Sequence, residues 1–206
     1  KYLLPDDKKF SEKQAQAKQK SAEESVEAYP RVVKNGDFSS GIEHWGTEGS
    51  IEISNSEGLL KAEVKDVGSE TYSTQLNQFG LQMIEGVDYR VTFQAKADQP
   101  RKVKLGLGKS LNSDPWYIDY LGDVKKTYQL GTEMETYSFE FSMTEKSYND
   151  AKLTFELGNI KGGNAQTTVY FNNIKVVPDY KDRQLSRDQK IDKLLSLMTL
   201  EEKIGQ

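Results

Sequence analysis

Cysteine is absent from the 206 residues, and histidine occurs once, as His44. Without cysteine the chain forms no disulfide, offers no thiolate nucleophile and holds no cysteine-ligated zinc. One histidine excludes a histidine metal triad, and a serine–histidine–aspartate site would have to use His44. Because His44 stands beside Trp45 in the sequence, we interpret it as a packing residue rather than a catalytic base.

Long apolar runs and clusters of positive charge are missing as well. The longest apolar stretches span a few residues, whereas a membrane helix needs about 20. The formal net charge is −4, and the basic residues gather on no single stretch. Phosphate backbones require clustered lysine and arginine, so we expect neither a membrane span nor a nucleic-acid partner. The first seven residues are polar, so we expect no signal peptide in them, and we expect the chain to be a piece of a longer protein.

The composition divides the chain into three zones. Residues 1–30 are rich in Ala, Gln, Glu and Lys, which favour helix, but they offer little apolar surface to bury. We expect a helical or partly disordered linker there, ended by Pro30. Residues 179–206 carry apolar residues at helical spacing. This second segment predicts a linker followed by the first helix of a further, truncated domain.

Residues 31–178 carry the signals of β-strands. Short segments rich in Val, Ile, Thr, Tyr and Phe alternate with period two and are separated by Gly, Asn, Asp and Ser. In residues 135–143, for example, Tyr137, Phe139 and Phe141 point to one side. About ten such strands, with no long helical period between them, predict an all-β antiparallel β-sandwich. Helical N- and C-terminal extensions would flank it.

Motifs for catalysis do not occur in this sequence. A retaining glycosidase needs two carboxylates about 5 Å apart, and the acidic ladder Glu-x-Asp-x-x-Glu of sandwich glucanases is missing. The glycine pairs at 106/108 and 162/163 lack the helix that follows a phosphate-binding loop. We therefore predict a non-catalytic domain, with a small sandwich hydrolase as the weaker alternative.

Three aromatic residues stand in polar surroundings. Tyr72 belongs to an expected strand over residues 72–78, and Trp116 and Tyr120 lie in the segment DPWYIDY. A flat ring can stack on the apolar face of a sugar, while nearby amides and charges bind its hydroxyls. Aromatic residues more often pack in cores or at edges, and composition alone favours that interpretation.

Oxygen-bearing side chains that suit calcium also occur, at Asp37, in the turn 56–58 and at 172–173. They are far apart in sequence, and simple turn chemistry explains them equally well.

Several ordered blocks of sequence are similar to one known family. These blocks are VVKNGDFSSGIEHW from Val32, the segment Thr74–Ala97, and then PRKVKLGLG, DPWYIDY, ETYSFEFSMTE, AKLTFELGN and TVYFNNIKVV. Over residues 31–178 the chain resembles family 4/9-type carbohydrate-binding modules, especially those attached to β-1,3-glucan-degrading enzymes. The resemblance implies a jelly roll with a concave groove that binds a glucan chain.

The resemblance also assigns residues to that groove. Tyr72 stands where the family often has a stacking tryptophan, so its smaller ring implies weaker stacking. With the resemblance, the sugar-stacking interpretation of Trp116 becomes the favoured one. The full set of implied carbohydrate contacts is Tyr72, Gln75, Lys104, Trp116, Tyr120 and Glu156.

The family holds a structural calcium ion, and the matching positions are Asp37, the carbonyl of Gly58, and Asn172. Asn172 departs from the usual aspartate, and the loss of a charge weakens such a site.

The tail DKLLSLMTLEEKIGQ (residues 192–206) resembles the first helix of family 3 glycoside hydrolases. It implies that the module precedes a β-glucosidase-type barrel in a secreted or cell-surface protein. Together the two resemblances predict a monomeric module that targets this hydrolase to β-glucan of β-1,3 or mixed linkage. A spacer domain that binds no sugar is the principal alternative.

Overall fold

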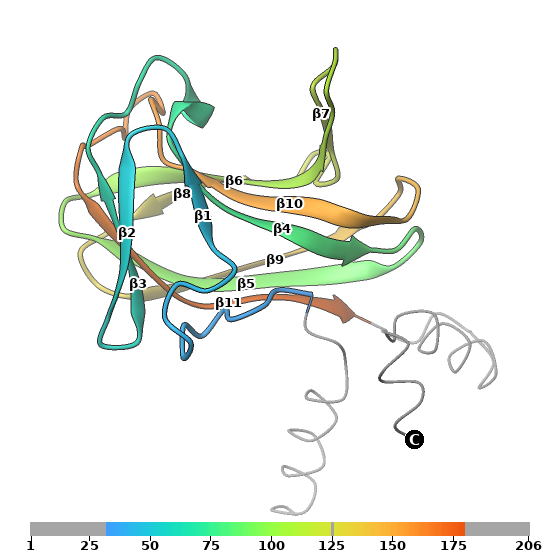
Figure 1. Ribbon diagram of the computed structural model, residues 1–206, viewed down its shortest axis with the longest axis horizontal. Helices are drawn as coiled ribbons and strands as arrows, with labels where there is room; N and C mark the ends of the chain where they lie inside the picture. Colours follow the sequence, from blue (N-terminus) through green and yellow to red (C-terminus); the bar gives the residue numbers. More distant parts are fainter. Residues whose placement is uncertain (1–31, 125, 180–206) are drawn as a thin grey trace, which may run out of the picture. The chain divides into compact units, whose positions relative to one another are not determined.

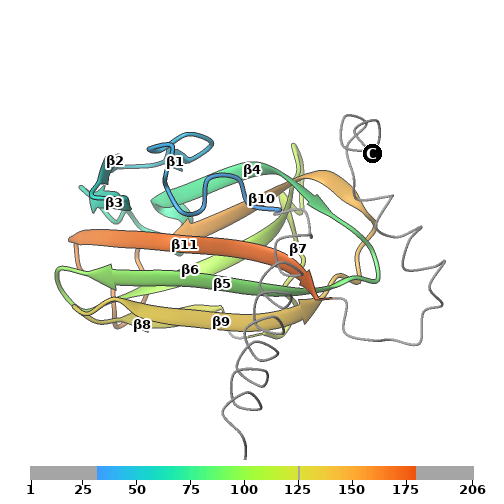
Figure 2. The same ribbon diagram turned by 90° about the horizontal axis from the view of Figure 1, so that it is seen from below.

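The computed structural model describes residues 32–124 and 126–179, and the predicted helical extensions lie outside this part of the chain. Eleven strands form two antiparallel sheets, which confirms the predicted all-β sandwich. Figures 1 and 2 show the sheets as two stacked layers. Within the described residues, no helix is long and apolar enough to cross a membrane.

The two sheets draw their strands from the whole length of the domain. The six-stranded sheet has the order β1 (Gly46–Glu48), β4 (Gln75–Met83), β10 (Tyr148–Glu156), β6 (Arg101–Ser110) and β7 (Tyr117–Asp119), with β8 (Thr127–Leu130) also paired to β6. The five-stranded sheet has the order β2 (Ile51–Ser56), β3 (Leu59–Val64), β11 (Thr168–Asp179), β5 (Asp88–Ala97) and β9 (Glu135–Ser142).

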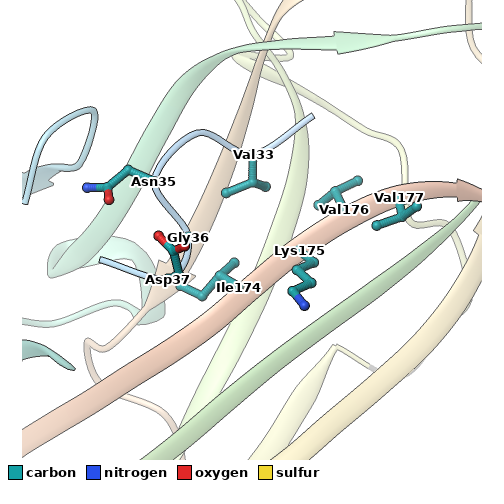
Figure 3. Close-up of a pocket in the computed structure, with 8 residues that line it drawn as sticks. All are labelled: Val33, Asn35, Gly36, Asp37, Ile174, Lys175, Val176 and Val177. Carbon is teal, nitrogen blue, oxygen red and sulfur yellow. The ribbon is translucent and has the colours of Figure 1, made fainter. Parts of the chain in front are cut away.

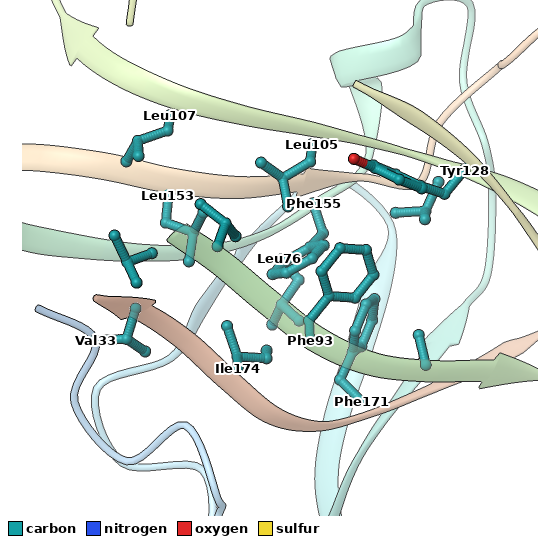
Figure 4. Packing of buried hydrophobic residues seen from close by; sticks show 14 of the residues in the cluster. Val33, Leu76, Phe93, Leu105, Leu107, Tyr128, Leu153, Phe155, Phe171 and Ile174 are labelled. Atoms are coloured by element: carbon teal, nitrogen blue, oxygen red, sulfur yellow. The ribbon is translucent and has the colours of Figure 1, made fainter. Parts of the chain in front are cut away.

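Alternating side chains build the core between the layers. Phe93 of β5 and Phe155 of β10 reach it from opposite sheets, and their ring centroids lie 5.2 Å apart. The ring centroid of Phe171 on β11 lies 4.7 Å from that of Phe155, and both side chains are drawn in Figure 4. Burial of each such ring contributes about 2 kcal/mol to folding. This core leaves the opposite, polar face of the six-stranded sheet open to solvent.

The interpretation of His44 as a packing residue is wrong. His44 is exposed and adopts a left-handed φ of 69°. Its neighbour Trp45 is the buried residue, and its indole Nε1 donates to the carbonyl of Asn35 at 3.1 Å. The turn at residue 44 directs the two consecutive side chains to opposite sides.

The strand predicted from Tyr72 begins three residues later, at Gln75. Residues Thr71–Ser73 form a short 3₁₀ helix, η1. Backbone hydrogen bonds hold this turn against the end of β10, because Gly158 N donates to the Thr71 carbonyl at 3.0 Å. Tyr72 therefore projects from a turn and not from the sheet.

The first residue of β6, Arg101, is a buried arginine. Arg101 has no exposed surface and donates to the carbonyls of Lys102 at 3.2 Å, Ala165 at 2.7 Å and Leu157 at 2.5 Å. Hydrogen bonds from a charged donor are stronger than neutral ones. This cluster fixes the segment after β10 against the sheet.

Candidate functional site

A cavity of about 640 Å³ opens on the outer face of the six-stranded sheet. We call it the hollow. Strands β4, β6 and β10 form its floor, and the turn η1 and the segment before β7 supply its aromatic sides; both rise from the same side of the sheet in Figure 1. The predicted contacts in its lining are Tyr72, Gln75, Lys104, Trp116 and Glu156. The fold thus brings together five of the six positions that the resemblance assigned.

Strand register places the floor residues in rows. Gln75 on β4 pairs with Glu156 on β10, which pairs with Lys104 on β6. In the next row Thr154 pairs with Gly106. Because neighbouring strands lie about 4.8 Å apart, each row spans the floor with side chains in reach of one another.

The first row is joined by charge-assisted hydrogen bonds. Lys104 Nζ lies 3.0 Å from Glu156 Oε2 and 3.2 Å from Oε1. The hydroxyl of Thr71 donates to the same carboxylate. Glu156 is 9% exposed, so a largely buried charge has the partners that it needs.

A second cluster joins the floor to β1. Lys152 Nζ lies 2.8 Å from Glu48 Oε1 and 2.8 Å from Gln75 Oε1, which also accepts a hydrogen bond from Thr154 at 3.0 Å. Gln75 Nε2 donates to the Tyr72 carbonyl at 2.6 Å and so connects the floor to the turn η1. The two clusters hold the polar groups in fixed positions before any ligand arrives.

Two exposed rings border this polar floor. Tyr72 is 60% exposed and Trp116 is 64% exposed. Trp116 adopts a φ of 61°, a left-handed conformation that costs a bulky residue roughly 1–3 kcal/mol. Two backbone hydrogen bonds hold its loop: the N–H of Trp116 donates to the carbonyl of Ser113 at 2.7 Å, and the N–H of Leu111 donates to the carbonyl of Trp116 at 2.8 Å. The loop thereby holds a large indole with most of its surface in solvent.

Tyr117 is a lining residue that our sequence reasoning missed. A Cβ built on Gly108 would lie 2.7 Å from Tyr117 Cζ, and one on Gly106 would lie 3.3 Å from its hydroxyl oxygen. The two glycines therefore make room for this ring beside β6. Glycine inside a strand marks such a close approach, and that signal was available in the sequence.

The hydroxyl of Tyr117 is buried and has no hydrogen-bond partner among the described residues. Burial raises the pKa of Tyr117, and the nearby charges of Asp119 and Glu156 raise it further. The phenol therefore stays neutral in the hollow, with one donor unmatched by the protein.

Tyr120 does not line the hollow, which corrects its predicted place in the groove. Its side chain is 4% exposed and lies in the core. A spacing of four residues puts two side chains on one face only along a regular strand. Trp116 lies in a loop before β7, so the spacing from Trp116 to Tyr120 does not place the two side chains on one face. Burial raises the pKa of Tyr120.

The three predicted calcium ligands lie around one corner of the five-stranded sheet. Gly36 O accepts from Ile174 N at 2.9 Å, which brings the segment of Asp37 beside β11 (Figure 3). Gly58 lies in the turn between β2 and β3, and β3 pairs with β11. Asn172 Oδ1 accepts a hydrogen bond from the backbone of Asn173 at 2.8 Å.

Calcium takes six to eight oxygen ligands. The described residues contain no group of three or more His, Cys, Asp and Glu that could hold a metal ion. A calcium site at this corner would therefore rest on Asp37 together with carbonyl and amide oxygens, and it stays a prediction. The cavity beside Asp37, about 40 Å³, has room for little more than a water molecule.

Comparison with known proteins identifies the family of this domain. The family model CBM_4_9, described as a carbohydrate-binding domain, matches residues 31–168. The chain belongs to this family. A CBM_4_9 domain is a carbohydrate-binding domain, and the hollow is the cavity of this domain that combines exposed rings with a polar floor. No curated protein matches the chain.

Solved structures agree with this assignment at the level of the fold. A CBM4 structure is 24% identical with a TM-score of 0.62, covering 71% of this chain and 99% of its own. The N-terminal cellulose-binding domain of β-1,4-glucanase C from Cellulomonas fimi is 19% identical with a TM-score of 0.55, covering 73% and 98%. A xylan-binding CBM22 domain from Paenibacillus barcinonensis is 8% identical with a TM-score of 0.53, covering 75% and 97%.

Proposed function

We propose that this CBM_4_9 domain binds a β-glucan of β-1,3 or mixed linkage in the hollow. The observation that carries the proposal is the pairing of two exposed rings, Tyr72 and Trp116, with a polar floor whose side chains are already held in place. A pyranose ring offers an apolar face to an aromatic side chain and hydroxyls to its polar neighbours.

The floor suits hydroxyl groups in particular. Carboxylate and amide oxygens accept from sugar hydroxyls, and the ammonium groups of Lys104 and Lys152 donate to them. Both lysines and Glu156 line the hollow. Because these groups are hydrogen-bonded in advance, a ligand meets little cost of ordering side chains.

We expect weak binding, in the micromolar to millimolar range. Each aromatic stack contributes about 1 kcal/mol, and an open cavity with two or three rings leaves most of the affinity to hydroxyl contacts. Weak binding still serves a module of this kind, since tethering raises the local concentration of the polymer around a linked enzyme.

Binding is a better account of the hollow than hydrolysis. The carboxylates in its lining are Glu48, Asp119 and Glu156, and a hydrolase would use one of them as a proton donor. Each accepts a hydrogen bond from a lysine instead, namely Lys152, Lys126 and Lys104 respectively. Release of reducing sugar from laminarin by the purified chain would favour the hydrolase.

We further propose that the module precedes a family 3 glycoside hydrolase in a secreted or cell-surface protein and acts as a monomer. The tail at residues 192–206 supports the linked hydrolase through its resemblance alone. In the full-length protein, deletion of residues 31–178 should lower activity on polymeric glucan while leaving activity on a soluble aryl glucoside unchanged. Equal loss on both substrates would argue for a spacer or folding role.

A binding panel tests the proposed ligand. Isothermal titration calorimetry with laminarin, barley β-glucan, xylan and cellulose oligosaccharides should give binding to the first two. Trp116→Ala should weaken that binding at least fivefold, whereas Ile42→Ala, which changes an exposed apolar residue outside the hollow, should not. Binding to none of the four, or equal binding by both variants, would refute the proposal.

A further inference from the structure

One exposed aromatic residue lies on the sheet face that bears the hollow but outside its lining. Phe79 is 52% exposed, and the other exposed large hydrophobic residues of the described chain are Ile42, Tyr72 and Trp116. Phe79 follows Gln75 on β4 by four residues, and alternate residues of a strand share a face. Its ring therefore stands on the same face as the hollow floor.

Lys152 connects this ring to the hollow. Its Nζ lies 5.3 Å from the centroid of the Phe79 ring, within cation–π range. The same Nζ is bound by Glu48 and Gln75, at 2.8 Å each, and Lys152 lines the hollow. Lys152 is 7% exposed, so its position is fixed by its partners. Phe79 thus lies directly beyond the hollow, on the far side of a lysine that both share.

The backbone around Phe79 directs the ring outward. Gly80 has a left-handed φ of 79°, and the pairing of β4 with β10 shifts register between Ala151 and Leu153. Such a bulge re-aims side chains at a sheet edge. Strand β1 covers β4 only from Gly46 opposite Asn77 to Glu48, so the edge beside Phe79 is not paired with β1. About half of the ring's surface is exposed.

We propose that Phe79 is a further sugar-stacking residue, which extends the site across β4 beyond the cavity lined by Trp116 and Tyr72. The inference rests on the proposed function, because it names an additional position for the same polymer. The ligand is an oligosaccharide long enough to occupy the hollow and to continue past Lys152 onto the Phe79 ring. Exposed Gln82 and Asp150 lie near that end, on β4 and β10, and add hydrogen-bonding groups.

A chain-length series separates this position from the hollow. We would titrate β-1,3-linked glucose oligosaccharides, from the disaccharide to the octasaccharide, into wild type, Phe79→Ala and Trp116→Ala. For wild type the affinity should rise until the ligand reaches Phe79. Phe79→Ala should match wild type on short ligands and fall about fivefold below it on the longest, which is the effect of one lost aromatic stack. Trp116→Ala should lose affinity at every length.

Two controls protect the interpretation. Phe79→Tyr keeps the ring and should retain the length dependence, and the unfolding midpoint of Phe79→Ala should stay near that of wild type, as expected for an exposed position. Wild-type affinity at every length in Phe79→Ala would overturn the inference and leave the proposed function intact. Failure of wild type to bind any of these oligosaccharides, laminarin or barley β-glucan would overturn both.

Discussion

The glycine at position 108 gives the sharpest test of how the hollow is built. A Cβ added there would lie 2.1 Å from the carbonyl oxygen of Ile118 and 2.7 Å from Tyr117 Cζ. The first contact is with the backbone of β7, which pairs with β6 at this point. Ordinary van der Waals contacts of a Cβ begin near 3.4 Å, so Gly108→Ala requires β7 to move away from β6 by roughly 1 Å.

Overpacking of this size destabilises a domain by about 2 kcal/mol. For a domain of about 150 residues, that loss lowers the melting temperature by roughly 4–8 °C. The same displacement moves Tyr117 and the loop of Trp116, so glycan affinity should fall together with stability. Differential scanning calorimetry and glycan titration of the same preparation would measure both effects.

Two other glycines provide a graded comparison. The Cβ added by Gly131→Ala has no neighbouring atom within 4 Å, so this substitution should change neither the melting temperature nor the glycan affinity. Gly106→Ala meets Thr154 Cγ2 at 2.8 Å and the Tyr117 hydroxyl at 3.3 Å, which are side-chain atoms that can shift. Its effect should be intermediate. A melting temperature for Gly108→Ala equal to that of Gly131→Ala would show that our account of β6 and β7 is wrong.

Three further predictions concern stability and metal binding. Arg101→Met removes the donor to three carbonyls, of which that of Leu157 is in a buried hydrogen bond and those of Lys102 and Ala165 are in part-buried ones, and it should lower the free energy of unfolding in urea by about 3 kcal/mol; a loss under 1 kcal/mol would contradict this. Burial raises the pKa of Tyr89 to about 12, whereas an unfolded tyrosine titrates near 10. Stability should therefore fall as pH rises from 10 to 12, by up to roughly 3 kcal/mol from this residue, and Tyr89→Phe should show a shallower decline in urea unfolding across that range. Calcium should raise the melting temperature over that in EDTA, and Asp37→Asn should abolish the difference; equal melting temperatures in both conditions would remove the calcium prediction.

The strands were the most predictable part of the structure. Alternation is a local property, so Tyr137, Phe139 and Phe141 could be placed on one face of β9 from the sequence alone. The convergence of Lys104 and Glu156 depends instead on the register between β6 and β10. No local pattern encodes that pairing, and only the family resemblance indicated it.

The wrong expectations concern residues at turns. Tyr72 lies in a 3₁₀ turn, where strand periodicity does not hold, so the strand expected from residue 72 begins only at Gln75. Tyr120, which the family resemblance assigned to the groove, follows the loop of Trp116 and points into the core. His44 lies at a turn that leaves it exposed while the side chain of Trp45 is buried. Phe79 shares the outward face of β4 with Gln75 by alternation, but its exposure also depends on where the pairing of β1 with β4 ends, and no local pattern encodes that end.

The most direct test of the central claim uses the two tryptophans of the chain. Trp45 is 7% exposed and Trp116 is 64% exposed, so acrylamide quenching of fluorescence should report mainly on Trp116 in the free protein. Saturation with barley β-glucan should protect that accessible fraction from the quencher, and Trp116→Phe should remove the protectable signal. Quenching that stays unchanged while calorimetry shows full saturation would mean that the polymer binds elsewhere, and the hollow would not be its site.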